Sequence, residues 1–228
     1  MKASREQGQN TRQRLLVAAV SVFAQKGYEA AGIREIARAA QVNSAMVQYH
    51  LGGKDGLYRA ALDFLFDQGP SNLVDVPEPP SPEDPEARAK AAVLLQRYIR
   101  SLLEAVFACP EDQDFPPEFE AAAHLFWTRA LLEPEGHSDL ILAHIRPYTE
   151  KLWAALEVLF PERSQEERFR LGASIQAQVL FFHHHARIIA LLRGAPYGPA
   201  DVPDLAAHIT SFSLRGLGLA AFLPNEGA

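Results

Sequence analysis

The side chains with the most distinctive chemistry lie between Ser44 and His50, where small and polar residues follow one another. The amide of Gln48 both donates and accepts hydrogen bonds, so it can pair with the edge of an adenine base. The side chains of Ala45 and Met46 suit contact with the methyl group of thymine. We therefore predict that four residues of this segment meet base edges in double-stranded DNA: Ser44, Ala45, Met46 and Gln48.

Other side chains near this segment are better suited to the phosphate backbone of DNA. Tyr49 and His50 carry polar groups that can donate to phosphate oxygens, and Lys54 carries a positive charge. Backbone amides at helix amino-termini bind phosphate as well. We predict that Tyr49, His50 and Lys54 fix the protein on DNA without reading its sequence.

Three consecutive histidines, residues 183–185, are the other conspicuous group in the sequence. Neighbouring residues on a helix point about 100° apart, so the three cannot ligate one ion without His124, His144 or an acid elsewhere. The sequence contains no HExxH, GxSxG or Walker motif. We therefore expect no metal, no cofactor and no enzyme activity, and keep a helical metal-dependent enzyme using the region His183–His185 as the alternative.

Aromatic residues with a few polar ones are spread over the later part of the chain. Cavities for small molecules are mostly apolar and carry a few placed polar groups. Filling of the core is the alternative for each aromatic residue. The residues predicted to bind a small-molecule effector are Phe107, Phe126, Arg129, Trp153, Phe181 and His184.

The elements that carry the first group are predicted from helical periodicity, which is the dominant pattern and indicates an all-α fold. The predicted amino-terminal helices cover residues 11–26, 34–39, 44–50 and 54–68. Gly27 ends the first helix, Asn43 caps the third, and Gly52-Gly53 forms a tight turn before the fourth. Two short helices joined by a short connection have helix-turn-helix geometry, in which the second helix enters the major groove.

A proline-rich segment then divides the chain, because residues 69–85 contain six of the sixteen prolines. Longer helices are predicted beyond it, over residues 86–108, 117–132, 137–160, 164–193 and 202–223. We therefore predict a helix-turn-helix DNA-binding domain at 1–53, a connecting helix at 54–68, a linker at 69–85 and a larger helical effector-binding and dimerisation domain at 86–228.

Charge divides along the same line. Residues 1–65 hold nine Lys and Arg against five Asp and Glu, a net charge of +4, although the whole chain has a net charge of −6. A basic head on an acidic body turns the head toward a polyanion. No apolar run reaches the roughly 18 residues that cross a bilayer, so we expect a cytoplasmic protein without a membrane partner. The single cysteine, Cys109, excludes an internal disulfide.

Together these segments resemble the TetR family of transcriptional regulators over about residues 10–65. The resemblance rests on TRQRLL at 11–16, FAQKGY at 23–28, IREIA at 33–37, VN at 42–43, YH at 49–50 and KDGLY at 54–58. It implies that Thr11, Tyr49, His50 and Lys54 meet phosphates and that residues 44–48 contact bases. Within such a head we also expect Arg34 to contact phosphate.

Four positions depart from the family pattern. Gly32 stands where a capping Thr or Ser is usual, which weakens the start of the second helix by about 1 kcal/mol at most. Gln41 replaces the usual turn glycine and must accept the backbone conformation of that turn. Gln48 and Leu51 replace common aromatic residues, so the operator sequence of another member cannot be transferred to this chain.

The later part, with FWTRALLEP at 126–134 and IRP at 145–147, is similar to the carboxy-terminal domain of CecR-type members. This similarity implies an effector core in the middle helices and a homodimer through the last two. Residues 164–193 and 202–223 are apolar on more than one face, which also calls for a partner. We predict a repressor that a small molecule releases from a palindromic operator; a DNA-binding dimer without a ligand is the rival.

Overall fold

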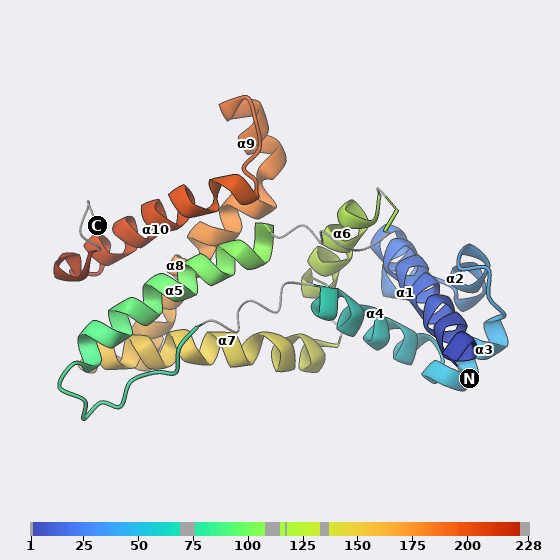
Figure 1. Ribbon diagram of the computed structural model, residues 1–228, viewed down its shortest axis with the longest axis horizontal. Helices are drawn as coiled ribbons and strands as arrows, with labels where there is room; N and C mark the ends of the chain where they lie inside the picture. Colours follow the sequence, from blue (N-terminus) through green and yellow to red (C-terminus); the bar gives the residue numbers. More distant parts are fainter. Residues whose placement is uncertain (1, 69–75, 108–114, 117, 133–136, 224–228) are drawn as a thin grey trace. The chain divides into compact units, whose positions relative to one another are not determined.

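The computed structural model describes residues 2–68, 76–107, 115, 116, 118–132 and 137–223, and its ordered elements there are all helical, as the all-α prediction required (Figure 1). The α-helices are α1 (Lys2–Ala30), α2 (Ile33–Ala39), α3 (Ser44–Leu51), α4 (Lys54–Gln68), α5 (Ala87–Phe107), α6 (Phe119–Leu132), α7 (Ser138–Leu159), α8 (Gln165–His184), α9 (Ala186–Arg193) and α10 (Val202–Gly216). Short 3-10 helices lie at Pro199–Asp201 (η2) and Ala220–Phe222 (η3). No helix in the described ranges is long and apolar enough to cross a membrane.

The chain divides into two compact units, and the division differs from the predicted domain boundaries. The first unit combines residues 1–68 with 111–144, and the second combines 69–110 with 145–228. Residues 111–144 join the first unit because α6 packs along α1. Residues 86–110 and 145–228 of the predicted effector-binding and dimerisation domain lie in the second unit, and the predicted domain boundaries stay predictions.

The core of the first unit follows from the apolar face of α1. Leu16 and Phe23 are buried, as the periodicity of this segment predicts. Phe126 of α6 stacks on Phe23, with ring centroids 5.7 Å apart, and meets the ring of Tyr58 edge-on at 5.1 Å. The helix-turn-helix segment thus shares one aromatic core with a helix from much later in the chain.

The ends of α1 show one correct and one incorrect prediction. Gly27 has a non-helical backbone (φ 75°, ψ 175°), so the helical path breaks where the glycine predicted it. The helix begins at Lys2 rather than near Thr11.

The second unit has a core built from α5, α7, α8 and α10. Inside it, the side-chain amide of Gln176 donates a 2.7 Å hydrogen bond to the hydroxyl of Tyr98. Burial raises the pKa of Tyr98 to about 12, so this hydroxyl stays protonated in the core. A segment predicted as one helix, 164–193, is two helices that meet at His185 (φ −107°, ψ 21°). Pro147 lies inside α7 without splitting it.

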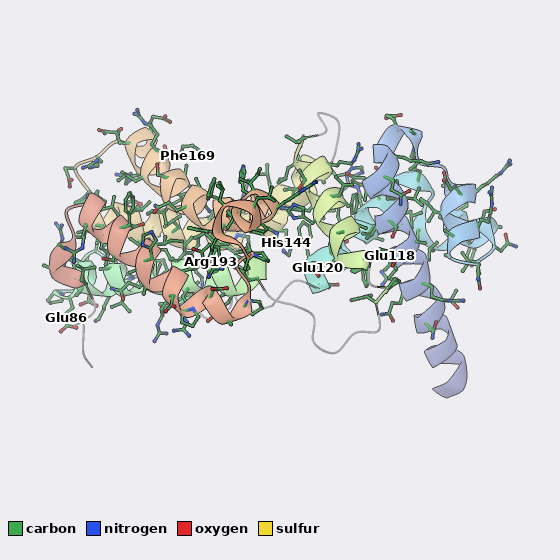
Figure 2. The ribbon with its side chains drawn as sticks, turned by 90° about the horizontal axis from the view of Figure 1, so that it is seen from above. Glu86, Glu118, Glu120, His144, Phe169 and Arg193 are labelled. Carbon is green, nitrogen blue, oxygen red and sulfur yellow. The ribbon has the colours of Figure 1, made fainter. Side chains whose placement is uncertain are left out.

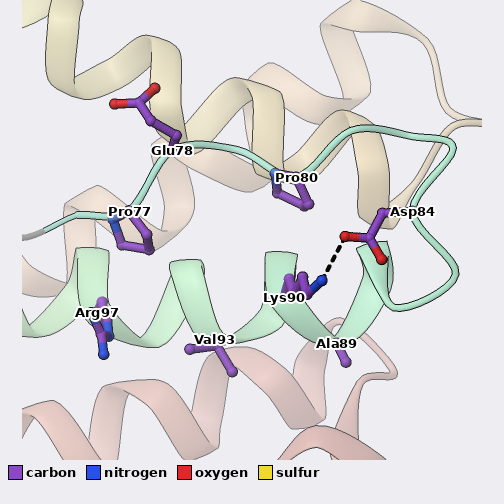
Figure 3. Close-up of a pocket in the computed structure, with 8 residues that line it drawn as sticks. All are labelled: Pro77, Glu78, Pro80, Asp84, Ala89, Lys90, Val93 and Arg97. Carbon is purple, nitrogen blue, oxygen red and sulfur yellow. Dashed lines mark hydrogen bonds and ion pairs between the residues drawn. The ribbon is translucent and has the colours of Figure 1, made fainter.

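The described part of the proline-rich segment, from residue 76 onward, lies along α5 (Figure 3). Val76 is buried, and its carbonyl accepts a 2.8 Å hydrogen bond from the ammonium of Lys151. Asp84 pairs with Lys90 of α5 at 2.6 Å. This stretch is therefore held to the second unit by its ends; residues 69–75 of the predicted linker lie outside the described part.

Candidate nucleic-acid interface

The turn between α2 and α3 depends on an unusual residue, Gln41. Its φ of 56° is left-handed. This is the conformation expected of a residue that stands where the family usually has a turn glycine. The turn is closed by backbone hydrogen bonds from Gln41 N to Arg38 O (3.1 Å) and from Val42 N to Ala37 O (2.9 Å). This geometry ends α2 at Ala39 and lets α3 begin at Ser44.

Helix α3 presents one buried and one exposed face. The side chain of Asn43 caps the helix, as predicted, by accepting a 2.9 Å hydrogen bond from the amide of Ala45. Val47 is fully buried and holds the inner face against the core, whereas Ala45, Gln48 and Tyr49 are exposed on the outside. Tyr49 is 85% exposed, although it is a large aromatic residue. Such a face suits a partner surface outside the chain.

The structure describes the side chain of only one of the three remaining α3 residues that are predicted to contact DNA. Ser44 is half-buried at the amino-terminal end of α3. The side chains of Met46 and His50 lie outside the described part of the structure, so their predicted DNA contacts stay predictions.

The connection from α3 to α4 requires glycine. Gly52 and Gly53 have φ of 69° and 97°, as the tight-turn prediction implied. The Gln48 amide folds back over this turn, since a Cβ on Gly53 would lie 3.1 Å from its Oε1. At Gly56 a Cβ would lie 1.5 Å from the carbonyl oxygen of Leu51, so only glycine allows α4 to approach the end of α3 this closely.

Lys54 lies at the first position of α4 and is held by the end of α1. Its ammonium donates a 2.8 Å hydrogen bond to the carbonyl oxygen of Glu29 and stands 4.7 Å above the ring of Tyr28. The ammonium has three N–H donors, so two are left for a phosphate oxygen. Lys54 is therefore an anchored cation rather than a free one.

The other two predicted phosphate contacts lie on the first two helices. Arg34 is exposed on α2, and within the described residues its side chain has no hydrogen bond or ion pair. Thr11 is half-buried on α1. Both are in the same unit as α3, which keeps all predicted DNA contacts on one body.

Sequence reasoning missed a cluster of charged groups beside Lys54. The carboxylate of Asp55 accepts a 2.5 Å hydrogen bond from Nε2 of His137, and the guanidinium of Arg59 pairs with both Asp55 (3.2 Å) and Asp139 (3.0 Å). The hydrogen bond from His137 is the main cause that holds the pKa of Asp55 below its ordinary value. The contacts of Arg59 with Asp139 and of His137 with Asp55 join residues about eighty positions apart, so the sequence gave no signal for them.

The six residues predicted to bind an effector fall into both units. Phe126 and Arg129 belong to the first unit, where Phe126 fills the core and Arg129 donates a 3.4 Å hydrogen bond to the carbonyl of Gln25. The other four belong to the second unit: Phe107, Trp153, Phe181 and His184. The six therefore do not line one pocket inside either unit.

Within the second unit these four residues have different surroundings. Phe107 is buried in the core, and Trp153 packs on Phe169, with ring centroids 5.4 Å apart. Phe181 is 49% exposed and stacks on His185 at 4.7 Å. His184 is half-buried. Their predicted role in effector binding stays a prediction.

An open pocket of about 420 Å³ lies elsewhere in the second unit, between α5 and the proline-rich segment (Figure 3). It contains none of the six predicted effector residues. Its lining residues are Pro77, Glu78, Pro80, Asp84, Ala89, Lys90, Val93 and Arg97.

The histidine run is spread out by its helix. His183 meets the ring of Phe107 edge-on at 6.0 Å, whereas the ring of His185 stacks on Phe181. In the part of the chain that the structure describes, no group of three or more His, Cys, Asp or Glu side chains is placed to hold a metal ion.

A short capped helix with a polar outer face, held behind a tight turn by a second short helix, defines a helix-turn-helix DNA-binding protein. Comparison with known families specifies the class. The family model described as "Bacterial regulatory proteins, tetR family" matches residues 15–61. The family model described as "HTH-type transcriptional dual regulator CecR, C-terminal domain" matches residues 91–217. The chain belongs to the TetR family of bacterial transcriptional regulators, with a carboxy-terminal domain of the CecR type.

Individual relatives match shorter stretches. The transcriptional repressor NicS of Pseudomonas putida is 29% identical over 99 residues, which are 42% of this chain and 45% of NicS. The probable transcriptional regulator YttP of Bacillus subtilis is 42% identical over 48 residues, which are 21% of this chain and 23% of YttP. The matched stretches thus span less than half of either relative.

Solved structures confirm the fold over nearly the whole chain. A TetR-like regulator from Rhodococcus sp. superposes with a TM-score of 0.53 and 17% identity, covering 91% of this chain and 96% of its own. A variant of HlyIIR gives a TM-score of 0.54 and 21% identity, covering 89% and 96%. At these identities the likeness is one of fold.

Proposed function

We propose that this regulator is a homodimeric repressor that binds a near-palindromic operator through α3 and leaves it when a small molecule binds. The observation that carries the proposal is the two-faced α3, with Val47 fully buried and Ala45, Gln48 and Tyr49 exposed. A dimer presents two such helices roughly 34 to 36 Å apart, one turn of DNA, and so reads two half-sites of inverted sequence.

Exposed apolar side chains support a dimer through the last helices. Phe169 (Figure 2) and Phe181 on α8 are 54% and 49% exposed, and Phe212 on α10 is 63% exposed. Ile209 and Leu214 of α10 are buried in the core of the same unit, so α10 is apolar on two sides. The symmetric arrangement that covers such a surface is a four-helix contact between α8 and α10 of two copies.

The dimer is tested by placing a charge in this surface. Phe212→Asp should convert the dimer to a monomer in sedimentation velocity and weaken binding to a palindromic duplex, because a carboxylate cannot be buried unpaired. Leu142→Asp, on an apolar side chain of α7 that is also half-exposed, is the matched control and should remain a dimer. A dimeric Phe212→Asp variant would assign the interface elsewhere.

Repression is tested with the DNA upstream of the gene. A footprint over two inverted half-sites, together with increased expression of a reporter after deletion of the gene, is the expected result. The name of NicS describes a repressor and that of CecR a dual regulator, so the direction of the reporter change distinguishes the two modes. Decreased reporter expression after deletion would make this protein an activator at that site.

Release by an effector requires that the ligand prefer the shape that does not fit DNA. The fourth helix is the proposed connection, since α4 begins beside α3 and continues to Gln68. A thermal-shift screen of small molecules should find compounds that stabilise the protein and also raise its dissociation constant for operator DNA. A compound that stabilises the protein but leaves DNA affinity unchanged would contradict this mechanism for that ligand.

A further inference from the structure

The beginnings of α4 and α7 are joined in the first unit by a part-buried hydrogen bond. The side chain of His137 is only 5% exposed and donates from Nε2 to the carboxylate of Asp55 at 2.5 Å. The backbone carbonyl of His137 accepts the first hydrogen bonds of α7, from the amides of Leu140 (2.9 Å) and Ile141 (3.1 Å). One residue therefore starts α7 and holds the first turn of α4.

The imidazole ring of His137 also packs against two tyrosines. Tyr58 of α4 stacks on it, with centroids 4.5 Å apart, and Tyr28 meets it edge-on at 5.5 Å. Tyr28 is the same ring over which the ammonium of Lys54 stands. His137 thus contacts the neighbour of Lys54 in sequence and the aromatic ring that supports Lys54.

A second, exposed pair reinforces this joint. The guanidinium of Arg59 bridges Asp55 of α4 and Asp139 of α7 at 3.2 and 3.0 Å. Its side chain is 41% exposed, and such surface pairs contribute little to stability. The part-buried bond of His137 is therefore the contact expected to fix the geometry.

We propose that His137 is a positioning residue for DNA binding: by holding Asp55 and Tyr28, it fixes the first turn of α4 so that the Lys54 ammonium faces a phosphate. The proposal rests on the DNA contact of Lys54 in the proposed function. His137 itself does not touch DNA.

The test compares His137→Phe, which keeps the stacked ring and removes the donor, with His137→Gln, which keeps an N–H donor. His144→Phe is the matched control, because this histidine lies on α7, the helix that begins one residue after His137, and stacks on an aromatic ring of α4 as His137 does, here that of Phe66 (3.5 Å). The probe is a duplex selected from a random-sequence pool by the wild-type protein, titrated across a salt series. If the wild-type protein selects no duplex, the proposed function itself fails, independently of His137.

His137→Phe should raise the dissociation constant about tenfold, the size of one lost hydrogen bond to a charged group. It should also lower the slope of log affinity against log salt by about one, as loss of one phosphate contact does. His137→Gln should recover most of the affinity, and His144→Phe should bind like the wild type. In a Lys54→Ala background His137→Phe should change affinity less than about twofold, because the two residues act through one contact.

The salt slope and the double variant separate positioning from mere stabilisation. A partly unfolded variant loses affinity without losing a phosphate contact, so its slope stays at the wild-type value. Wild-type affinity of His137→Phe, or a loss that adds in full to that of Lys54→Ala, would overturn the proposal. If His137→Phe does not fold, Asp55→Ala replaces it, since this side chain is 61% exposed and its substitution removes the acceptor while sparing the core.

Discussion

The indole ring of Trp153 lies directly against Gly172, so that a Cβ on this glycine would come within 1.9 Å of Cζ3. Glycine at this position lets α7 and α8 approach each other through a large aromatic side chain. Gly172→Ala should therefore lower the free energy of unfolding by about 1–3 kcal/mol, the usual cost of overpacking a core. Gly216→Ala on α10, where nothing lies within 4 Å of the added Cβ, is the matched control in thermal unfolding. Equal melting temperatures for the two variants would contradict this packing.

Gln41 should be a position where glycine improves stability. A left-handed φ such as the 56° of Gln41 costs a residue with a Cβ about 1–2 kcal/mol. Glycine removes this cost, but the greater conformational entropy that it gives the unfolded chain offsets part of the gain in stability. We expect Gln41→Gly to raise the stability by less than about 1 kcal/mol and Gln41→Val to lower it, because β-branched side chains tolerate this region least. Chemical denaturation of the two variants checks the order, and a more stable valine variant would exclude a strained turn.

Gly32 leaves the start of α2 without a side-chain cap. Its backbone is extended (φ −106°, ψ 133°), and a Cβ there meets nothing within 4 Å. Gly32→Ser should therefore stabilise the protein by a few tenths of a kcal/mol, because the hydroxyl can accept from a free amide of the first turn. Gly32→Ala supplies the Cβ without the hydroxyl and should fall below the serine variant in a denaturant titration.

The sequence predicted those features that depend on neighbouring residues. The cap at Asn43 and the break at Gly27 follow from local backbone chemistry, whereas the left-handed Gln41 was expected from the resemblance to the family; all three are present. The break at His185 was not predicted, because no glycine or proline stands near it to mark the end of a helix.

Features that depend on distant contacts were missed for a physical reason. The predicted role of Phe126 in effector binding stays a prediction, but its stacking on Phe23 in the core of the first unit was not foreseen. Nothing in its local pattern distinguishes these roles, since an aromatic residue on an apolar helix face fits both. The role of His137 was likewise not predicted, because its contact with Asp55 joins residues far apart in the sequence.

The capping box of α8 should make part of the stability depend on pH. Hydrogen bonds from the side chain and the amide of Ser164 hold the pKa of Glu167 below its ordinary value of 4.5. A carboxyl with a lowered pKa contributes stability above its ordinary pKa and loses it as pH falls through the folded-state pKa. Glu167→Gln should therefore melt lower than the wild type at neutral pH, and the difference should shrink in acid. A difference that grows below pH 4.5 would contradict the assignment.

In the proposed function Gln48 reads the bases and Lys54 holds the phosphate backbone. The deciding measurement is the affinity of the wild type, Gln48→Ala and Lys54→Ala for the selected duplex and for a scrambled duplex across a salt series. We predict that Gln48→Ala loses about 1–3 kcal/mol of discrimination between the duplexes with the salt slope unchanged. Lys54→Ala should weaken both duplexes alike and lower the slope by about one. Full discrimination by Gln48→Ala, together with an unchanged slope for Lys54→Ala, would contradict the reading of DNA by α3.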